Sequence, residues 1–205
     1  MSLTTVIFDL GGVLVQTRWD GVTRRLTEMS GLTSEAVMQA VTGEVGYQFM
    51  LGRFDAAEFH RRLTGQLRVE IDADDFFALW RGVIAVDDDS SRPGGVYDIV
   101  TRLRGRYRLA IGSNTDELHY ARGLELQPSL EDFDDVLLSY ELGRCKPDPQ
   151  FFVLGLRKLG VQADECVFID DRPDNVAAAS SLGITGLHFT SAARLEADLT
   201  ELGLL

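Results

Sequence analysis

The sequence is poor in the features that mark secreted or membrane-spanning proteins. Its 205 residues include only two cysteines, Cys145 and Cys166, too few for a disulfide framework and consistent with a reducing cytosol. No run of about 18 apolar residues occurs, so we expect no transmembrane helix and no membrane partner. The first four residues lack the basic region and cleavage signal of a secretory leader. We therefore expect a cytoplasmic protein.

Positive charge is also scarce. Twenty Lys and Arg residues stand against 32 Asp and Glu residues, giving a formal net charge of −12, which argues against a general nucleic-acid surface. Lysine occurs only as Lys146 and Lys158. The 45% of apolar and 25% of charged residues are typical of a globular protein. The length suits one core with an insertion, or two small domains. We expect a monomer or a homodimer.

The apolar pattern changes along the chain. Residues 4–10 form a β-branched apolar run, and residues 14–90 then carry apolar positions at helical spacing. A polar stretch at residues 87–95 reads as a hinge. Beyond it, strand-like and helical segments alternate, which predicts right-handed crossovers and a parallel sheet.

The same pattern predicts individual elements and a domain organisation. The expected helices cover residues 19–30, 34–41, 55–67, 72–86, 96–103, 117–124, 149–159, 175–182 and 191–202. The expected strands cover residues 4–10, 107–112, 135–140, 166–169 and 186–189. We predict an α/β fold in which residues 1–14 and 91–205 form a Rossmann-like parallel-sheet core. Residues 15–90 are predicted to form an inserted, all-helical cap.

Two of the expected strands end in acid. The apolar run at residues 6–8 leads into Asp9, and the run at residues 167–169 leads into Asp170 and Asp171. Ligands of open parallel sheets bind beyond the carboxyl ends of the strands, which makes Asp9 a candidate nucleophile. A solvated strand end explains Asp9 equally well. The adjacent acids repel one another unless a cation compensates, and they suit Mg²⁺, although a helix N-cap is the structural alternative.

Two polar motifs follow other strands. Ser113, Asn114 and Thr115 could bind a phosphate oxygen at the start of a helix, or simply cap that helix. Lys146 lies in a segment with one glycine and two prolines, which would hold it more firmly than an ordinary surface lysine. It could neutralise both an attacking carboxylate and a transferred anion.

Taken in order along the chain, these motifs resemble those of the haloacid dehalogenase superfamily of hydrolases. The segments that carry the resemblance are residues 8–14, 112–115, 146–152 and 168–179. The position of residues 15–90 resembles the subclass with a helical cap inserted after the first motif. The resemblance implies a Mg²⁺-dependent phosphomonoester hydrolase that acts on a small phosphorylated metabolite.

The resemblance also implies roles for the acids. Asp9 would attack phosphorus, form an aspartyl phosphate and help to bind Mg²⁺. The backbone carbonyl of Gly11 and the carboxylate of Asp171 would be further metal ligands, with Asp170 assisting. A cation is needed because a carboxylate and an anionic ester repel by about 4 kcal/mol per unit-charge pair at roughly 4 Å near a protein surface.

A second set of residues would hold the phosphate. By resemblance, Ser113 and Asn114 would contact its oxygens and Lys146 would offset its charge. Gly11 and Gly12 would let the backbone turn sharply and approach the ligand closely.

The chain departs from the family at Gly11. Phosphatases of this superfamily usually carry a second Asp there as general acid and base, a role worth roughly 10²–10⁴-fold in rate. His60, Glu44 and Arg53 are candidates for a replacement from the cap. Aromatic and sulfur side chains of the cap would line either a substrate pocket or the cap core; these are Trp19, Phe49, Met50 and Trp80.

Three other functions remain open. In a dehalogenase, Asp9 would attack carbon without a metal, although Asp170 and Asp171 would then place excess negative charge beside an anionic substrate. Carbon–phosphorus cleavage of the phosphonoacetaldehyde hydrolase type needs a cap lysine, and residues 14–90 contain none. The third reading is a degenerate member that binds a ligand without turnover.

Overall fold

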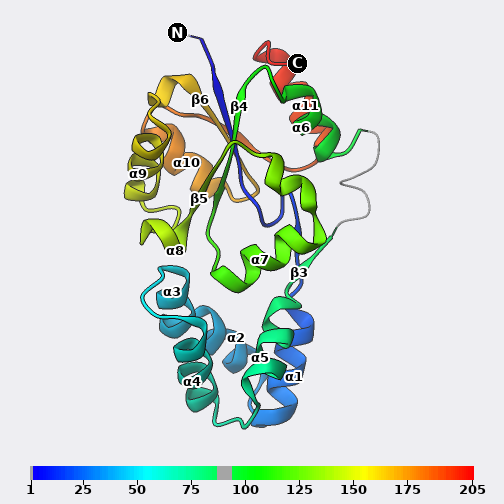
Figure 1. Cartoon of the computed structure of the whole chain (residues 1–205), viewed down its shortest axis with the longest axis vertical. Coiled ribbons are helices and arrows are strands. Elements are labelled where there is room, and N and C mark those ends of the chain that lie inside the picture. The colour runs from blue at the N-terminus through cyan, green and yellow to red at the C-terminus, as the bar shows by residue number, and fades with distance from the viewer. Residues whose placement is uncertain (1, 87–93) are drawn as a thin grey trace.

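The sheet and its helices form one end of the molecule, and a group of five helices forms the other (Figure 1). The computed structural model describes residues 2–86 and 94–205. Most of the polar hinge expected at residues 87–95 lies outside these residues. Within them, no helix combines the length and the apolar character needed to cross a bilayer.

Five parallel strands form the central sheet in the order β5-β4-β1-β6-β7. They are β1 (Thr5–Phe8), β4 (Arg108–Ser113), β5 (Asp135–Leu138), β6 (Cys166–Asp170) and β7 (Thr185–His188). Strand β1 is central and fully buried, as its continuous apolar sequence requires. Its register pairs Phe8 with Ile111 of β4 and with Ile169 of β6, so all three strands end at nearly the same level. The predicted parallel α/β fold is confirmed.

Helices cover both faces of the sheet. Val6 and Phe8 face a core built with α6 (Val96–Leu103) and α11 (Ala192–Glu201), while Ile7 faces α9 (Pro149–Leu159) and α10 (Pro173–Ser181). The remaining core elements are α7 (Glu117–Leu126), α8 (Ser139–Leu142) and the short 3₁₀ turns Pro128–Asp132 and Ala163–Glu165. Alternate side chains of each strand are therefore buried on opposite faces.

A second group of helices, here called the helical segment, lies beyond the carboxyl ends of the strands (Figure 1). Its members are α1 (Asp20–Ser30), α2 (Ser34–Thr42), α3 (Glu44–Met50), α4 (Ala56–Leu67) and α5 (Ala73–Arg81). Three begin at side-chain caps, since Thr33, Asp55 and Asp72 each accept a hydrogen bond from the backbone N–H three residues on. Aromatic rings fill its interior, with Phe49 and Phe59 stacked at 4.2 Å between centroids.

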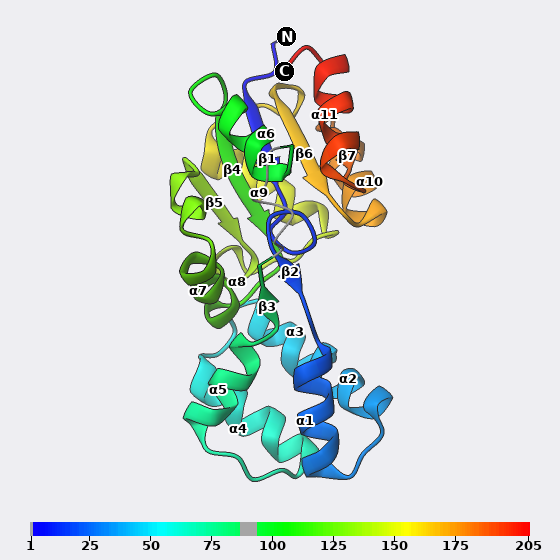
Figure 2. The same cartoon turned by 90° about the vertical axis from the view of Figure 1, so that its right-hand side faces the viewer.

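The connection to the helical segment corrects one expectation. Residues 15–90 are not all-helical, because β2 (Gln16–Thr17) and β3 (Ile84–Ala85) pair as an antiparallel ribbon where the chain enters and leaves the helices (Figure 2). The helix expected over residues 72–86 ends at Arg81. Gly82 follows it and disfavours further helix, and the β-branched Val83 and Ile84 favour the ribbon. Helix α3 was not expected, and the strand expected over residues 135–140 stops at Leu138.

Candidate active site

Asp9 lies where three strands end together. It follows the last residue of β1, between Gly112 of β4 and Asp170 of β6 in the sheet register. Its side chain is almost fully buried, and its Oδ1 accepts a hydrogen bond of 2.7 Å from the backbone N–H of Leu10. A carboxylate held in this way has little freedom to turn, which suits a nucleophile.

Lys146 brings the two acidic strand ends together. Its Nζ lies 2.9 Å from Oδ1 of Asp9 and 2.6 Å from Oδ2 of Asp170, and it donates a 2.7 Å hydrogen bond to the carbonyl of Gly112. An ammonium group has three N–H donors, so these three acceptors use its full capacity. Lys146 is only 4% exposed, and the buried cation therefore has fixed partners.

Asn114 fixes the backbone that carries this lysine. Its Nδ2 donates to the Lys146 carbonyl at 2.8 Å, and its Oδ1 accepts from the Lys146 N–H at 2.7 Å. Both ends of the amide are thus engaged with one residue. The contact explains how a lysine on a loop is positioned against strands β1 and β6. A direct phosphate contact by Asn114 stays a prediction.

Asp170 and Asp171 differ in their surroundings. Asp170 is fully buried, and it accepts hydrogen bonds from Asn175 Nδ2 at 3.0 and 3.1 Å and from the Arg172 N–H at 2.9 Å. Asp171 is exposed. Asp9, Asp170 and Asp171 nevertheless each offer an oxygen within 4.8 Å of the others.

The cluster carries more negative than positive charge. Burial raises the pKa of Asp9 to about 6, the nearby Lys146 cation opposes this, and Asp170 adds to it. Burial and the charge of Asp170 also raise the pKa of Asp171. Three carboxylates thus share one lysine, an arrangement that a bound cation would stabilise.

The two glycines after Asp9 are different in kind. Gly12 has φ +77°, and a Cβ there would lie 2.5 Å from Oδ2 of Asp171, so only glycine lets this loop lie against that carboxylate. Gly11 does not adopt a positive φ, and a Cβ there would meet only the Thr17 methyl at 3.2 Å. The conformation therefore requires glycine at position 12 but not at position 11.

These features fit a hard divalent cation. The donors are carboxylate oxygens, the type that Mg²⁺ prefers, and they are brought close by the strand ends and by Gly12. The acidic cluster could therefore bind a metal. Ligation by the Gly11 carbonyl stays a prediction.

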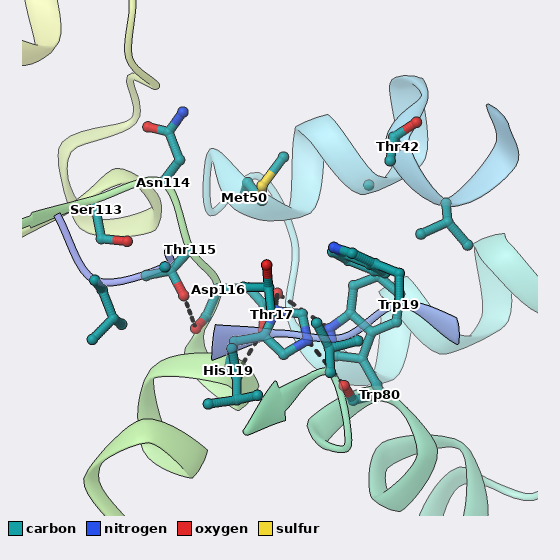
Figure 3. A pocket seen from close by; sticks show the side chains of 16 residues that line it. Thr17, Trp19, Thr42, Met50, Trp80, Ser113, Asn114, Thr115, Asp116 and His119 are labelled. Carbon is teal, nitrogen blue, oxygen red and sulfur yellow. Dashed lines mark hydrogen bonds and ion pairs between the residues drawn. The ribbon is translucent and has the colours of Figure 1, made fainter. Parts of the chain in front are cut away.

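An apolar cavity of about 110 Å³ opens beside this cluster, between the sheet and the helical segment. Its polar border includes Gly11 and Ser113, and the Ser113 side chain is directed toward the open space (Figure 3). Trp19, Met50 and Trp80 form much of its opposite wall. These three residues of the expected cap therefore line a cavity, whereas Phe49 packs on Phe59 in the interior of the helical segment.

A buried polar network joins the two parts of the molecule at this cavity. Asp116 Oδ2 lies 2.8 Å from Nδ1 of His119 and accepts a 3.1 Å hydrogen bond from Nε1 of Trp80. The other ring nitrogen of His119 lies 2.9 Å from the Trp80 carbonyl, and the two rings stack (Figure 3). Burial would raise the pKa of Asp116, but His119 and the hydrogen bonds outweigh it and lower that pKa.

Sequence reasoning missed Asp116 and His119. The available signals were weak: His119 is one of three histidines, and Asp116 stands three residues before it at a helix start. The candidates proposed instead lie elsewhere. His60 contacts the Ile71 carbonyl at 2.9 Å and packs on Phe76, while Glu44 accepts from Gln48 on its own helix. Arg53 lies near Gly143, outside the described cavity wall.

The sequence profile of the haloacid dehalogenase-like hydrolases matches residues 3–183. The chain belongs to this family and is a hydrolase. That result confirms the family resemblance drawn from the four motifs.

The chain is similar to curated proteins whose names refer to chemically different compounds. A sesquiterpene phosphatase of Aspergillus oryzae is 25% identical over 98% of this chain and 97% of its own length. A D-ribitol-5-phosphate phosphatase of Bacteroides thetaiotaomicron is 25% identical over 97% of each chain. Flavin mononucleotide hydrolase 1 of Arabidopsis thaliana is 47% identical over 62 residues, which are 30% of this chain and 25% of that protein.

Solved structures share the fold. An enzyme of this family from Bacteroides thetaiotaomicron, in complex with magnesium and inorganic phosphate, superposes with a TM-score of 0.78 at 23% identity, covering 93% of this chain and 96% of that one. L-2-haloacid dehalogenase from Xanthobacter autotrophicus has a TM-score of 0.62 at 19% identity, covering 97% and 82%. At these identities the likeness establishes the fold alone.

Proposed function

We propose that the protein is a Mg²⁺-dependent phosphomonoester hydrolase that acts on a small phosphorylated metabolite through an aspartyl phosphate. The observation that carries this proposal is the buried Lys146 between Asp9 and Asp170, with Asp171 completing an acidic cluster. The full-length relatives named as phosphatases support it, as does the magnesium and phosphate complex of a protein with the same fold.

The chemistry assigned to this site begins at Asp9. A carboxylate oxygen forms a bond to phosphorus while the bond from phosphorus to the alcohol oxygen breaks, and water later cleaves the aspartyl phosphate to release inorganic phosphate. Lys146 holds Asp9 in position and reduces the repulsion between it and the ester. Asp9, Asp171 and the Gly11 carbonyl would hold Mg²⁺ with Asp170 assisting, and the ion would neutralise the charge that develops on phosphate oxygens.

Other residues position the phosphate. Ser113 and the backbone at Gly11 and Gly12 are proposed to contact its oxygens, where the strand ends leave polar groups beside Asp9. Because Gly11 supplies no side-chain acid, the alcohol oxygen would take its proton from water. This step favours alcohols that leave readily.

The helical segment is proposed to act as the cap. We assign residues 15–90 to it, with the ribbon β2–β3 as its connection, and the remaining residues to the catalytic core. The cavity between the two parts would then receive the alcohol portion of the ester. Cytoplasmic location and the absence of nucleic-acid and membrane partners belong to the same proposal.

The test is phosphate release from a broad panel of small phosphate esters, with Mg²⁺ and with EDTA. Asp9→Asn should abolish release, whereas Asp164→Asn should not, because exposed Asp164 precedes the opposite end of β6. Absence of release from the entire panel would refute the phosphatase proposal. Chloride release from a 2-haloacid in EDTA would favour the dehalogenase instead, since halide leaves without a proton or a metal.

A further inference from the structure

The size of the cavity beside Asp9 and the polar groups in its wall limit which alcohol it could receive. We propose that the substrate is the phosphate ester of a small alcohol with a compact apolar body of roughly four to six carbon atoms, branched or cyclic, rather than of a polyol. This inference rests on the proposed phosphatase function and deepens it. It uses the size of the cavity and the hydrogen bonds already made by its wall.

The volume sets the size of the body. The cavity measures about 110 Å³, somewhat less than the roughly 150 Å³ of a protein cavity that accommodates benzene. It begins at Gly11 and Ser113, close to Asp9, so a phosphate at the strand ends would direct its alcohol inward. A compact body of about five carbon atoms, somewhat smaller than a benzene ring, fits this space, and a much longer chain does not.

The polar groups of the wall are already used within the protein. Thr42 donates to the Met38 carbonyl at 2.7 Å, and the amide of Asn114 is engaged at both ends by Lys146. Asp116 and His119 are engaged with one another and with Trp80. The Thr42 hydroxyl proton and one N–H of Asn114 are therefore already committed within the protein. Asp116, whose two oxygens face four donors, has no acceptor capacity left for a ligand.

Among the described residues of the wall, few side-chain polar atoms have no partner within the chain. They are the hydroxyls of Thr17 and Ser113 and the indole N–H of Trp19. Both hydroxyls belong to the phosphate end, since Ser113 ends β4 and the Thr17 methyl lies 3.2 Å from the place of a Gly11 Cβ. Among the side chains that line the rest of the cavity, the Trp19 indole N–H is thus the polar group that has no partner within the described chain, and it lies among apolar groups.

This arrangement disfavours a polyol. Each hydroxyl that leaves water without gaining a partner weakens binding by about tenfold or more. A pentitol phosphate would bring four hydroxyls into a wall whose side-chain polar groups are mostly committed within the protein. An aliphatic or aromatic body has no such requirement, and Trp19 and Trp80, at 5.5 Å between ring centroids, offer it ring faces and edges.

A matched pair of substrates tests the inference on the wild-type protein. Isopentyl phosphate and a pentitol 5-phosphate have five carbons each and the same phosphate, and they differ in hydroxyl content. The pentitol is the more acidic alcohol and the better leaving group, so a preference for the isopentyl ester would come from binding and not from leaving-group ability. We expect kcat/KM for isopentyl phosphate to be at least about 100-fold higher. Equal values, or a preference for the pentitol ester, would overturn the inference and leave the phosphatase function intact.

Two valine-to-threonine substitutions in α2 test whether the cavity wall determines the preference for the isopentyl ester. Val41 and Val37 lie one turn apart in α2 and are both buried, but only Val41 lines the cavity. Val41→Thr should reduce the isopentyl-to-pentitol ratio about three- to tenfold, because it adds a polar group to the wall. Val37→Thr should lower stability to a similar extent and leave the ratio unchanged. A change of ratio in Val37→Thr but not in Val41→Thr would place the selectivity elsewhere.

Tryptophan fluorescence gives a readout that does not depend on turnover. The chain has two tryptophans, Trp19 and Trp80, and both line the cavity. Isopentyl alcohol should change their emission saturably, and the free pentitol should not. This binding difference should persist even if no ester is hydrolysed, so failure of the phosphatase proposal and failure of the cavity inference can be told apart. No response to isopentyl alcohol would refute the cavity inference.

Discussion

The charged cluster around Asp9 and the apolar cavity beside it meet at Gly11 and Ser113, yet they are built differently. The cluster consists of core residues at strand ends, held by contacts such as the 2.6 Å pair between Lys146 and Asp170. The cavity wall comes from both the core and the helical segment, and its polar groups are mostly engaged within the protein. Under the proposed function, the reaction would depend on the sheet, whereas selection of the alcohol would depend on how the helical segment lies against it.

The largest effect should come from the buried lysine. Lys146→Met leaves Asp9 and Asp170 without their shared cation, and breaking a buried ion pair costs about 3–5 kcal/mol of unfolding free energy. Lys158, the other lysine, pairs with Glu141 on the surface, where such a pair contributes about 0–1 kcal/mol.

Urea unfolding of Lys146→Met and Lys158→Met in EDTA at neutral pH measures this difference. Equal losses in the two variants would mean that the buried contacts of Lys146 with Asp9 and Asp170 stabilise the protein no more than a surface ion pair does. Phosphate release should disappear in Lys146→Met and persist in Lys158→Met.

The next largest effect concerns Gly11 and Gly12, which lie between the charged cluster and the cavity. Substitutions at these two positions should change the rate of phosphate release in opposite directions. Gly11→Asp should raise the rate of phosphate release by about tenfold or more, because it adds a general acid at a position where a Cβ would meet only the Thr17 methyl. Gly12→Ala should instead lower the rate, since its Cβ would clash with Asp171 and its φ of +77° is strained for alanine.

Steady-state kinetics with an ester of a poor leaving alcohol reveals the first effect most clearly. If Gly11→Asp folds normally but is no faster, proton transfer does not limit the wild-type rate. If Gly12→Ala retains full Mg²⁺-dependent activity, the approach of the loop to Asp171 is unimportant.

Much of the charged cluster could be predicted because its signals are local in sequence. Asp9, Asp170 and Asp171 each follow an apolar run, and parallel strands bring such residues to one edge. The cavity could not be predicted in this way. The hydrogen bond from Trp80 to Asp116 joins residues 36 positions apart across two parts of the fold. The ribbon β2–β3 has two residues per strand, too few to show a periodicity.

Helix boundaries show the same distinction between local and tertiary signals. The expected starts at Ser34 and near Asp55 were close to the observed ones because side-chain caps act over three residues. His60 was a candidate for the active site, but its ring packs against Phe76 and therefore points into the helical segment. Only tertiary contacts decide which face of such a helix meets the core.

A smaller effect concerns metal binding and stability. Mg²⁺ should raise the thermal midpoint of the wild-type protein by roughly 5–10 °C at 100 times its dissociation constant, because it relieves repulsion among the acids. Asp171→Asn should reduce this gain strongly. Asp174→Asn should not, because Asp174 pairs with Arg172 at 2.9 Å and is not part of the cluster. Differential scanning fluorimetry across a Mg²⁺ titration gives both values, and an equal gain in all three proteins would exclude Asp171 as a ligand.

The smallest expected effect tests the link between the two regions. Trp80→Phe removes the N–H that bonds Asp116, but the second partner of that oxygen, His119, remains, so the cost should be about 1 kcal/mol. Trp19→Phe is the matched control because its indole N–H has no partner among the described residues. Chemical unfolding measures the stability, and the isopentyl-to-pentitol ratio of kcat/KM reports on the cavity wall.

If Trp80→Phe lowers stability more than Trp19→Phe and shifts this ratio without changing Mg²⁺ affinity, the network positions the cavity wall independently of the charged cluster. Loss of Mg²⁺ affinity in Trp80→Phe would instead mean that the cluster and the cavity are one coupled unit.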